Sequence, residues 1–156
     1  MLITDLLKVA KLESEVKKKP ELYLDLAAAY ESGPRAKLSE EYTASLKPDK
    51  TETDQSKVIL ANLNGVIDNQ IDAEARAAAL TTDAGKKKEI VTELTSLYKY
   101  RNKTATDANV TELVASRSFQ ADSGYAGAHH FVAHAGSIFH VGHDWRCESS
   151  ADKSFD

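Results

Sequence analysis

Apolar side chains in the first 48 residues recur every three or four positions, in three segments that are separated by prolines. This spacing places them on one face of a helix, so the sequence predicts three short helices. Lys17–Lys19 close the first helix, where cations favour the negative end of the helix dipole. Pro20 suits the first position of the second helix, which we expect to stop at Gly33-Pro34. The third should end before Pro48. The apolar positions are Leu2, Leu6, Val9, Leu12 and Val16 in the first segment, Leu22, Leu26 and Tyr30 in the second, and Leu38, Tyr42 and Leu46 in the third.

A wholly polar stretch over residues 48–55 predicts an exposed loop, and the apolar pattern after it predicts a long helix over about residues 55–81. One local signal competes with this helix, because Asn64-Gly65 is a strong hairpin turn and apolar residues flank it. The alanine-rich half that follows would make a poor strand and lacks a period of two, so the helix is preferred. Its apolar positions include Leu60, Leu63, Ile67, Ile71, Ala75 and Ala78.

Two more helices are expected before residue 120. Thr81-Thr82-Asp83 offers N-cap residues for a helix that runs to about Arg101, and Asp107 can cap a shorter one. Their apolar positions are Ile90, Val91, Leu94, Leu97 and Tyr98 in the first and Val110, Leu113 and Val114 in the second. The fold class is therefore mainly α, a bundle of five or six helices whose short loops make successive helices antiparallel neighbours.

The helical pattern stops at about Phe119, which divides the chain into a helical body over residues 1–120 and a C-terminal arm over residues 121–156. The arm holds four of the seven glycines, all five histidines, the only tryptophan and the only cysteine, and it has no leucine. Two runs of β-forming residues, 130–134 and 138–141, flank Ala135-Gly136-Ser137 and predict a small β-hairpin. An isolated hairpin is marginal in water, so we expect the extended arm to lie on the body or on another chain.

The body and the arm also differ in net charge. The body is nearly neutral, with 18 Lys/Arg and 19 Asp/Glu, whereas the arm has 2 and 5. The overall net charge of −4 argues against a protein that grips nucleic acid, which normally requires a basic face. Protonation of all five histidines would change the net charge of the arm from −3 to +2.

One cysteine, Cys147, cannot form a disulfide within the chain, and no secretory leader or membrane-spanning stretch is recognisable in the sequence. We therefore expect a reducing compartment, either the cytoplasm or a virion, and no contact with a membrane.

The histidines of the arm are the strongest chemical candidates. Their side chains and the thiol are good ligands for zinc or another transition metal, but no recognised zinc motif is present. Hairpin and helical conformations would also bring different pairs together. We expect the histidines to pack against a protein surface, and a metal site or a pH-responsive contact remains the alternative. The candidate metal ligands are His130, His134, His140, His143 and Cys147.

Large aromatic residues in the arm are candidates for partner binding. Trp145 beside Arg146 is a pair of the kind that is enriched at interface hot spots, and Trp145 could instead cover the core of the body. Phe131 and Phe139 lie on the two halves of the expected hairpin. A Cys147–histidine nucleophile is less favoured, because an arm by itself supplies neither an orienting group nor an oxyanion hole.

In the body, carboxylates on the long helix could form an acid/base or metal cluster. The expected helix spacing favours a solvated face instead, with Asp68 and Asp72 one turn apart and Glu74 nearby. The glycines of the body stand alone, so no phosphate-binding loop is predicted.

Together these features lead us to expect a non-enzymatic structural or assembly subunit, without a cofactor, of a homo-oligomer and of a larger protein complex. A helical body with a long tail is similar in broad layout to small connector and head-completion proteins of tailed phages, so a virion connector, neck or shell component is one example. The alternative is a small metal-binding or pH-responsive module that uses the histidine-rich arm.

Overall fold

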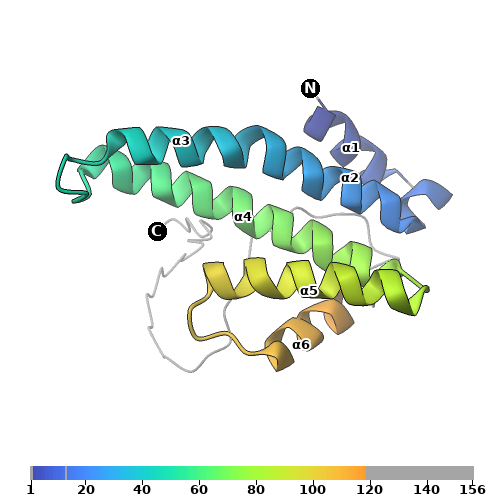
Figure 1. Cartoon of the computed structure of the whole chain (residues 1–156). Helices are drawn as coiled ribbons and strands as arrows, with labels where there is room; N and C mark the ends of the chain where they lie inside the picture. The colour runs from blue at the N-terminus through green and yellow to red at the C-terminus, as the bar shows by residue number, and fades with distance from the viewer. Residues whose placement is uncertain (1, 13, 119–156) are drawn as a thin grey trace, which may run out of the picture.

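A computed structural model describes residues 2–12 and 14–118 of the chain. This part contains no strand, and its six α-helices are joined by short connections and by two short helical turns (Figure 1). The predicted helical bundle is confirmed here, whereas the predicted hairpin and the rest of the arm lie outside the described residues. The elements are α1 (Leu2–Lys11), the 3-10 turn η1 (Glu15–Lys18), α2 (Pro20–Tyr30), the π-helical turn η2 (Glu31–Arg35), α3 (Ala36–Ser45), α4 (Asp54–Leu80), α5 (Ala84–Arg101) and α6 (Asp107–Ser118).

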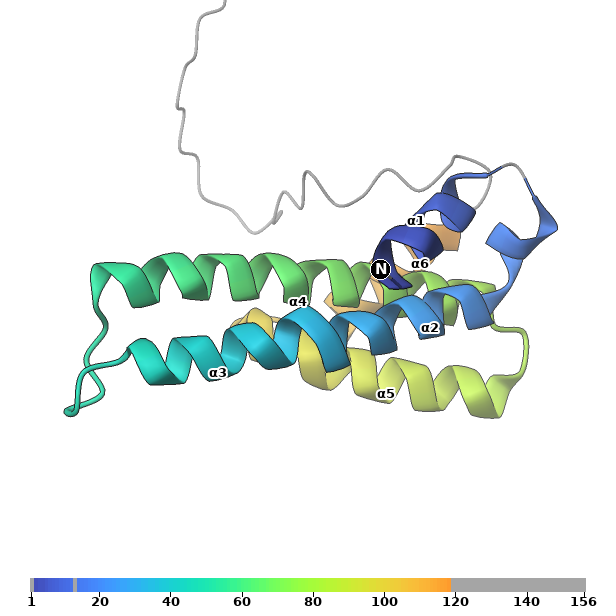
Figure 2. The same ribbon diagram turned by 90° about the horizontal axis from the view of Figure 1, so that it is seen from above.

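The central element is α4, which contacts α2, η2, α3, α5 and α6. Figures 1 and 2 show α2, η2 and α3 running antiparallel to α4 along its length, with α5 and α6 on other sides. Every residue from Gln70 to Ala78 is buried, because neighbours surround this half of α4. Four alanines in this stretch, Ala73, Ala75, Ala77 and Ala78, are fully buried and let those neighbours approach closely.

The prediction of one long helix through Asn64-Gly65 is confirmed. Gly65 lies in the regular part of α4, and a Cβ added there would meet nothing within 4 Å. The start of α4 is fixed by a capping box that the sequence analysis did not identify. Ser56 N donates to Thr53 Oγ1 at 3.0 Å and Thr53 N donates to Ser56 Oγ at 2.7 Å, which satisfies amides that the first turn leaves free.

The expected stop at Gly33-Pro34 is wrong, because the chain continues from α2 into α3 through η2. Pro34 has no N–H, and a regular α-helix would place its ring against the carbonyl of the residue four positions earlier. The wider π turn accommodates it, and the Ala36 N–H bonds to the Glu31 carbonyl five residues back. The helix therefore passes the proline and presents Glu31 and Arg35 on a turn of unusual geometry.

The first helix is shorter than expected. It ends at Lys11 rather than near Lys19, and Ser14 adopts an extended backbone (φ −141, ψ 157) before η1 begins. Leu12 and Val16, which the periodicity assigned to the buried stripe, are 59% and 42% exposed. The apolar spacing continues beyond Lys11, but the helix ends there. The chain turns at this point, and α2 then packs against α1.

The remaining helix starts agree with the sequence. The Asp83 carboxylate accepts from Lys86 N at 2.8 Å and caps α5, while α6 begins at Asp107. Within residues 2–12 and 14–118, no helix combines the length and apolar character needed to cross a membrane.

Candidate functional site

The three acidic side chains of α4 that the sequence placed on a solvated face lie elsewhere, and that expectation is wrong. Asp72 and Glu74 are buried, with 4% and 8% of their surface exposed, and the Asp68 side chain is about one-third exposed. Helical periodicity assigns one wet face to a helix, but α4 is surrounded on all sides in this region. Each carboxylate instead faces a different neighbouring element.

Asp72 joins α4 to α6. Its Oδ1 lies 2.6 Å from Nε of Arg117, and its Oδ2 accepts from Nε of Arg76 at 3.1 Å. Arg76 also lies over the ring of Tyr23 on α2, with Cζ 6.0 Å from the ring centroid. Burial is the main cause that raises the pKa of Tyr23 above its usual value of 10.0. This cluster joins α2, α4 and α6 around the carboxylate of Asp72. Both oxygens of that carboxylate lie against an arginine.

Asp68 joins α4 to α5 in a similar way. Arg101 donates from Nη2 to Asp68 Oδ2 at 3.0 Å, and its Nε lies 2.9 Å from Oδ1. The Nη2 contact is a hydrogen bond, and the Nε contact is a close ion pair, so both oxygens of Asp68 lie against the guanidinium.

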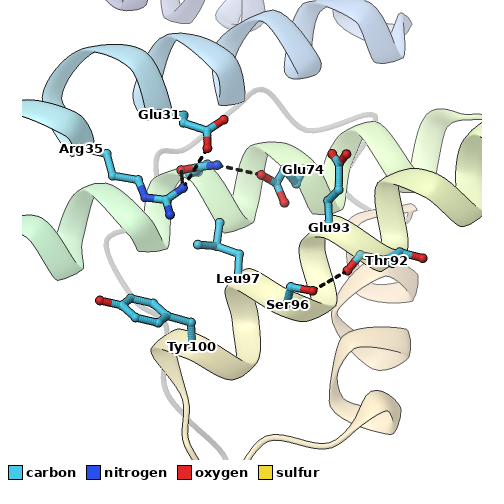
Figure 3. Close-up of a pocket in the computed structure, with 9 residues that line it drawn as sticks. Glu31, Arg35, Glu74, Thr92, Glu93, Ser96, Leu97 and Tyr100 are labelled. Carbon is cyan, nitrogen blue, oxygen red and sulfur yellow. Dashed lines mark hydrogen bonds and ion pairs between the residues drawn. The ribbon is translucent and has the colours of Figure 1, made fainter. Parts of the chain in front are cut away.

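Glu74 is different, because it lies at a cleft of about 560 Å³ where η2, α4 and α5 meet (Figure 3). A volume of this size is within the usual range for small-molecule sites. Figure 3 shows α5 forming one wall, with Glu93, Ser96, Leu97 and Tyr100, and the helix that carries Glu31 and Arg35 forming another. The lining residues are Glu31, Arg35, Gln70, Glu74, Thr92, Glu93, Ser96, Leu97 and Tyr100.

A continuous series of polar contacts runs along the cleft from η2 to α4. Arg35 Nη1 contacts Glu31 Oε1 at 3.3 Å and donates to Gln70 Oε1 at 3.1 Å. The amide nitrogen of Gln70 then donates to Glu74 Oε1 at 2.9 Å. Gln70 therefore orients Glu74, and the π turn positions the arginine that orients Gln70.

The second carboxylate oxygen of Glu74, Oε2, is buried and has no hydrogen-bond partner in this part of the chain. Burial raises the pKa of Glu74 to about 7, the hydrogen bond from Gln70 opposes this rise, and the charges of Glu93 and Glu31 add to it. The Arg35 charge also lowers this pKa, but less. Near neutral pH, Glu74 is thus a carboxyl group that readily gains or loses a proton.

The hydroxyls in the cleft show no sign of activation as nucleophiles. Thr92 Oγ1 donates to the Lys88 carbonyl at 2.8 Å, and Ser96 Oγ donates to the Thr92 carbonyl at 3.1 Å. A base-activated hydroxyl would instead donate to an imidazole or a carboxylate. The arrangement is suited to binding a polar or charged group and exchanging a proton with it.

The candidate residues predicted from the sequence all lie outside the described residues. This holds for the potential metal ligands His130, His134, His140, His143 and Cys147, and for the potential partner contacts Phe131, Phe139, Trp145 and Arg146. Among residues 2–12 and 14–118, no group of three or more His, Cys, Asp or Glu side chains is arranged to hold a metal ion.

Sequence reasoning named Glu74 as part of a possible acid/base cluster but assigned it to a solvated face, although two signals pointed to its burial. Gln70 and Glu74 are one helical turn apart, and the charged residues Asp72, Glu74 and Arg76 alternate with alanines within a long apolar helix. Small residues between charged ones indicate close packing of neighbours around the charges. Comparison of the chain with protein-family models, with curated proteins and with solved structures found no significant match in any of the three.

Proposed function

We propose that this chain is a non-enzymatic structural or assembly subunit of a homo-oligomer, and that residues 121–156 dock on neighbouring copies. The observation that carries the proposal is that α1–α6 bury one apolar core among themselves, and α6 completes it. Val110 is 1% exposed, and Leu113 and Val114 are 7% and 8% exposed. The body thus closes its core before the arm begins, which leaves the arm available for another role.

The arm also starts from an anchored point. Arg117, one residue before the end of α6, is held by Asp72 at the centre of the bundle. The chain after Ser118 has 38 residues, which extend at most about 137 Å, whereas the 27 residues of α4 extend about 40 Å. The arm is therefore long enough to reach an adjacent copy from a fixed origin.

The body offers apolar surface that an arm could cover. Within residues 2–12 and 14–118, four of the six exposed large apolar side chains lie near the N-terminus, on α1, η1, α2 and the link between them. They are Leu2, Leu12, Val16 and Leu24. Phe131, Phe139 and Trp145 of a neighbouring arm have the chemistry to cover such a surface, with Arg146 at its rim. Larger assemblies, such as a virion connector, neck or shell, are built from contacts of this kind.

The test compares the full chain with a chain that ends at Ser118. Light scattering after size exclusion should give a multiple of the monomer mass for the full chain and one monomer for the truncated chain. Circular dichroism should show that the truncated chain keeps its helices. Equal assembly states of the two chains, or a monomeric full chain at about 100 µM, would contradict the proposal.

The same experiment separates this proposal from its alternative, a metal-binding arm. The native mass is measured with and without a chelator, and the metal content of the untagged protein is determined. Assembly that persists in chelator supports docking by protein contacts alone. Stoichiometric zinc, together with loss of assembly in chelator, would assign the histidines His130, His134, His140 and His143 to a metal site instead.

Two further variants locate the docking surface. Val16→Glu on the full chain places a charge on the exposed N-terminal surface and should lower the assembled fraction. Val58→Glu, on the exposed side of α4 at 62% exposure, is the matched control and should leave it unchanged. If both variants assemble like the original chain, the arm does not dock near Val16.

A further inference from the structure

The Glu74 cleft combines features that a purely structural cluster lacks. Asp68 and Asp72 each use both carboxylate oxygens in ion pairs with arginines, whereas Glu74 uses only Oε1. Only 8% of the surface of Glu74 is exposed, and the residue lines an open cleft that can admit a small molecule. A buried polar oxygen without a partner is costly, and it gains most from a ligand that donates a hydrogen bond or carries a positive charge.

The charge of the cleft favours a cation. Three carboxylates line it, from Glu31, Glu74 and Glu93, against one cation, Arg35. Arg35 is already engaged, since its Nη1 contacts both Glu31 and Gln70. An anion would meet excess negative charge, so a positively charged group is the complementary ligand.

Within the part of the chain that the structure describes, no group of three or more His, Cys, Asp or Glu side chains is arranged to hold a metal ion, so we consider an organic cation. The other end of the cleft is less polar, with buried Leu97 and the ring of Tyr100. Lys103 Nζ already lies 5.1 Å from the centroid of the Tyr100 ring, which places a positive charge at this end and directs a ligand's cation toward Glu74.

We propose that the cleft binds a primary ammonium group on a short hydrocarbon chain. The ammonium pairs with the carboxylate of Glu74 where this residue lines the cleft and is attracted by Glu93 and Glu31, and the hydrocarbon lies against Leu97 and Tyr100. This site is independent of the proposed assembly function, because it uses residues of the body alone.

Binding of the ammonium is coupled to the loss of one proton from Glu74. A protonated Glu74 releases its proton to solvent, and the ligand's ammonium, which keeps all three of its hydrogens, takes the place of that proton beside the carboxylate. The charged groups that face Glu74 are Glu93 on α5 and Glu31 and Arg35 on η2, with Gln70 as its neutral neighbour on α4. Because an alkylammonium has a pKa near 10, it stays charged while Glu74 titrates.

The test uses three probes of equal chain length and different charge: n-butylammonium, 1-butanol and butyrate. Each is titrated into the ¹⁵N-labelled full chain at pH 8, and the side-chain amide of Gln70 reports occupancy because it donates to Glu74. We expect n-butylammonium to shift this signal with an affinity in the millimolar range, as is usual for so few atoms. The other two probes should bind at least tenfold more weakly. Between pH 6 and pH 8 the affinity for the ammonium should rise about tenfold, as Glu74 loses its proton around pH 7.

Three variants complete the test. Glu74→Gln should weaken binding of n-butylammonium at least tenfold, and Glu93→Gln, an exposed position that leaves the fold undisturbed, should weaken it two- to threefold. Glu40→Gln removes an exposed carboxylate of α3 outside the cleft and should change the affinity less than 1.5-fold. Equal binding of the three probes, or an affinity of Glu74→Gln within twofold of the original, overturns the proposal. If Glu74→Gln does not fold, an unchanged affinity in Glu93→Gln together with a flat pH profile overturns it.

Discussion

Asp72 of α4 and Arg117 of α6 form an ion pair of 2.6 Å in which both side chains are largely buried, at 5% and 15% exposure. The same carboxylate accepts from Arg76 one helical turn along α4. Two guanidinium groups therefore depend on a single buried negative charge, and the last turn of α6 depends on it as well.

Replacing Asp72 with Asn should lower the free energy of unfolding by about 3–5 kcal/mol, because removing one partner of a buried ion pair leaves the other charges uncompensated. Urea unfolding at pH 7 measures this change. The control is Asp5→Asn, which removes an exposed ion pair with Lys8 (3.4 Å, side chains 63% and 71% exposed) and should cost less than about 0.5 kcal/mol. A loss below about 1 kcal/mol for Asp72→Asn would show that the cluster contributes little to stability.

Glu74 makes the stability of the body depend on pH in a direction opposite to that of most carboxylates. Its pKa is about 7 in the folded chain and about 4.5 in the unfolded chain, so between these values the folded state holds a proton that the unfolded state has lost. This contribution to stability is fully present below about pH 4.5 and is lost as the pH rises through about 7.

Glu74→Gln removes this titration and keeps a neutral group beside Gln70. At pH 8 the free energy of unfolding of the variant should therefore exceed that of the original chain by on the order of 2–3 kcal/mol. At pH 4.5 the two chains should differ little. The measurement is urea unfolding of both chains from pH 4.5 to 8.5. A difference that does not grow with pH would mean that Glu74 ionises at its ordinary pKa.

Gly65 provides a test of the continuity of α4. The site is helical and open, so Gly65→Ala should raise the free energy of unfolding by up to about 1 kcal/mol, which is the difference in helix propensity. Gly85→Ala is the matched comparison, since its new Cβ would lie 3.3 Å from Asp83 Oδ1, the oxygen that caps α5, and the gain should be smaller. Destabilisation by Gly65→Ala in thermal unfolding would favour the hairpin turn that Asn64-Gly65 otherwise predicts.

The sequence was most informative about the position and the first turn of individual helices. The periodicity over Leu63, Ile67 and Ile71 predicted α4, and Asp83 predicted the start of α5. Both features are local, since they depend on helix geometry and on the first free amides of a helix. The predicted bundle followed from them.

The candidate cleft could not be predicted in the same way, because it depends on how elements far apart in sequence meet. Pro34 predicted a helix end, but the chain passes it in a π turn, and α2 and α3 on either side of that turn both pack along α4. The burial of Glu74 likewise depends on α5 and η2 lying on either side of it. A periodic pattern describes one helix at a time and carries no information about neighbours on all sides.

The position of Arg117 has a mechanical consequence. Any load that the chain beyond Ser118 transmits to the body enters through the final turn of α6, where helices ordinarily fray. Here that turn is fastened to the middle of the bundle at Asp72, so tension reaches the longest helix before it can unwind α6 from its end. The attachment of the arm to the body therefore rests on this buried ion pair together with the buried apolar side chains of α6.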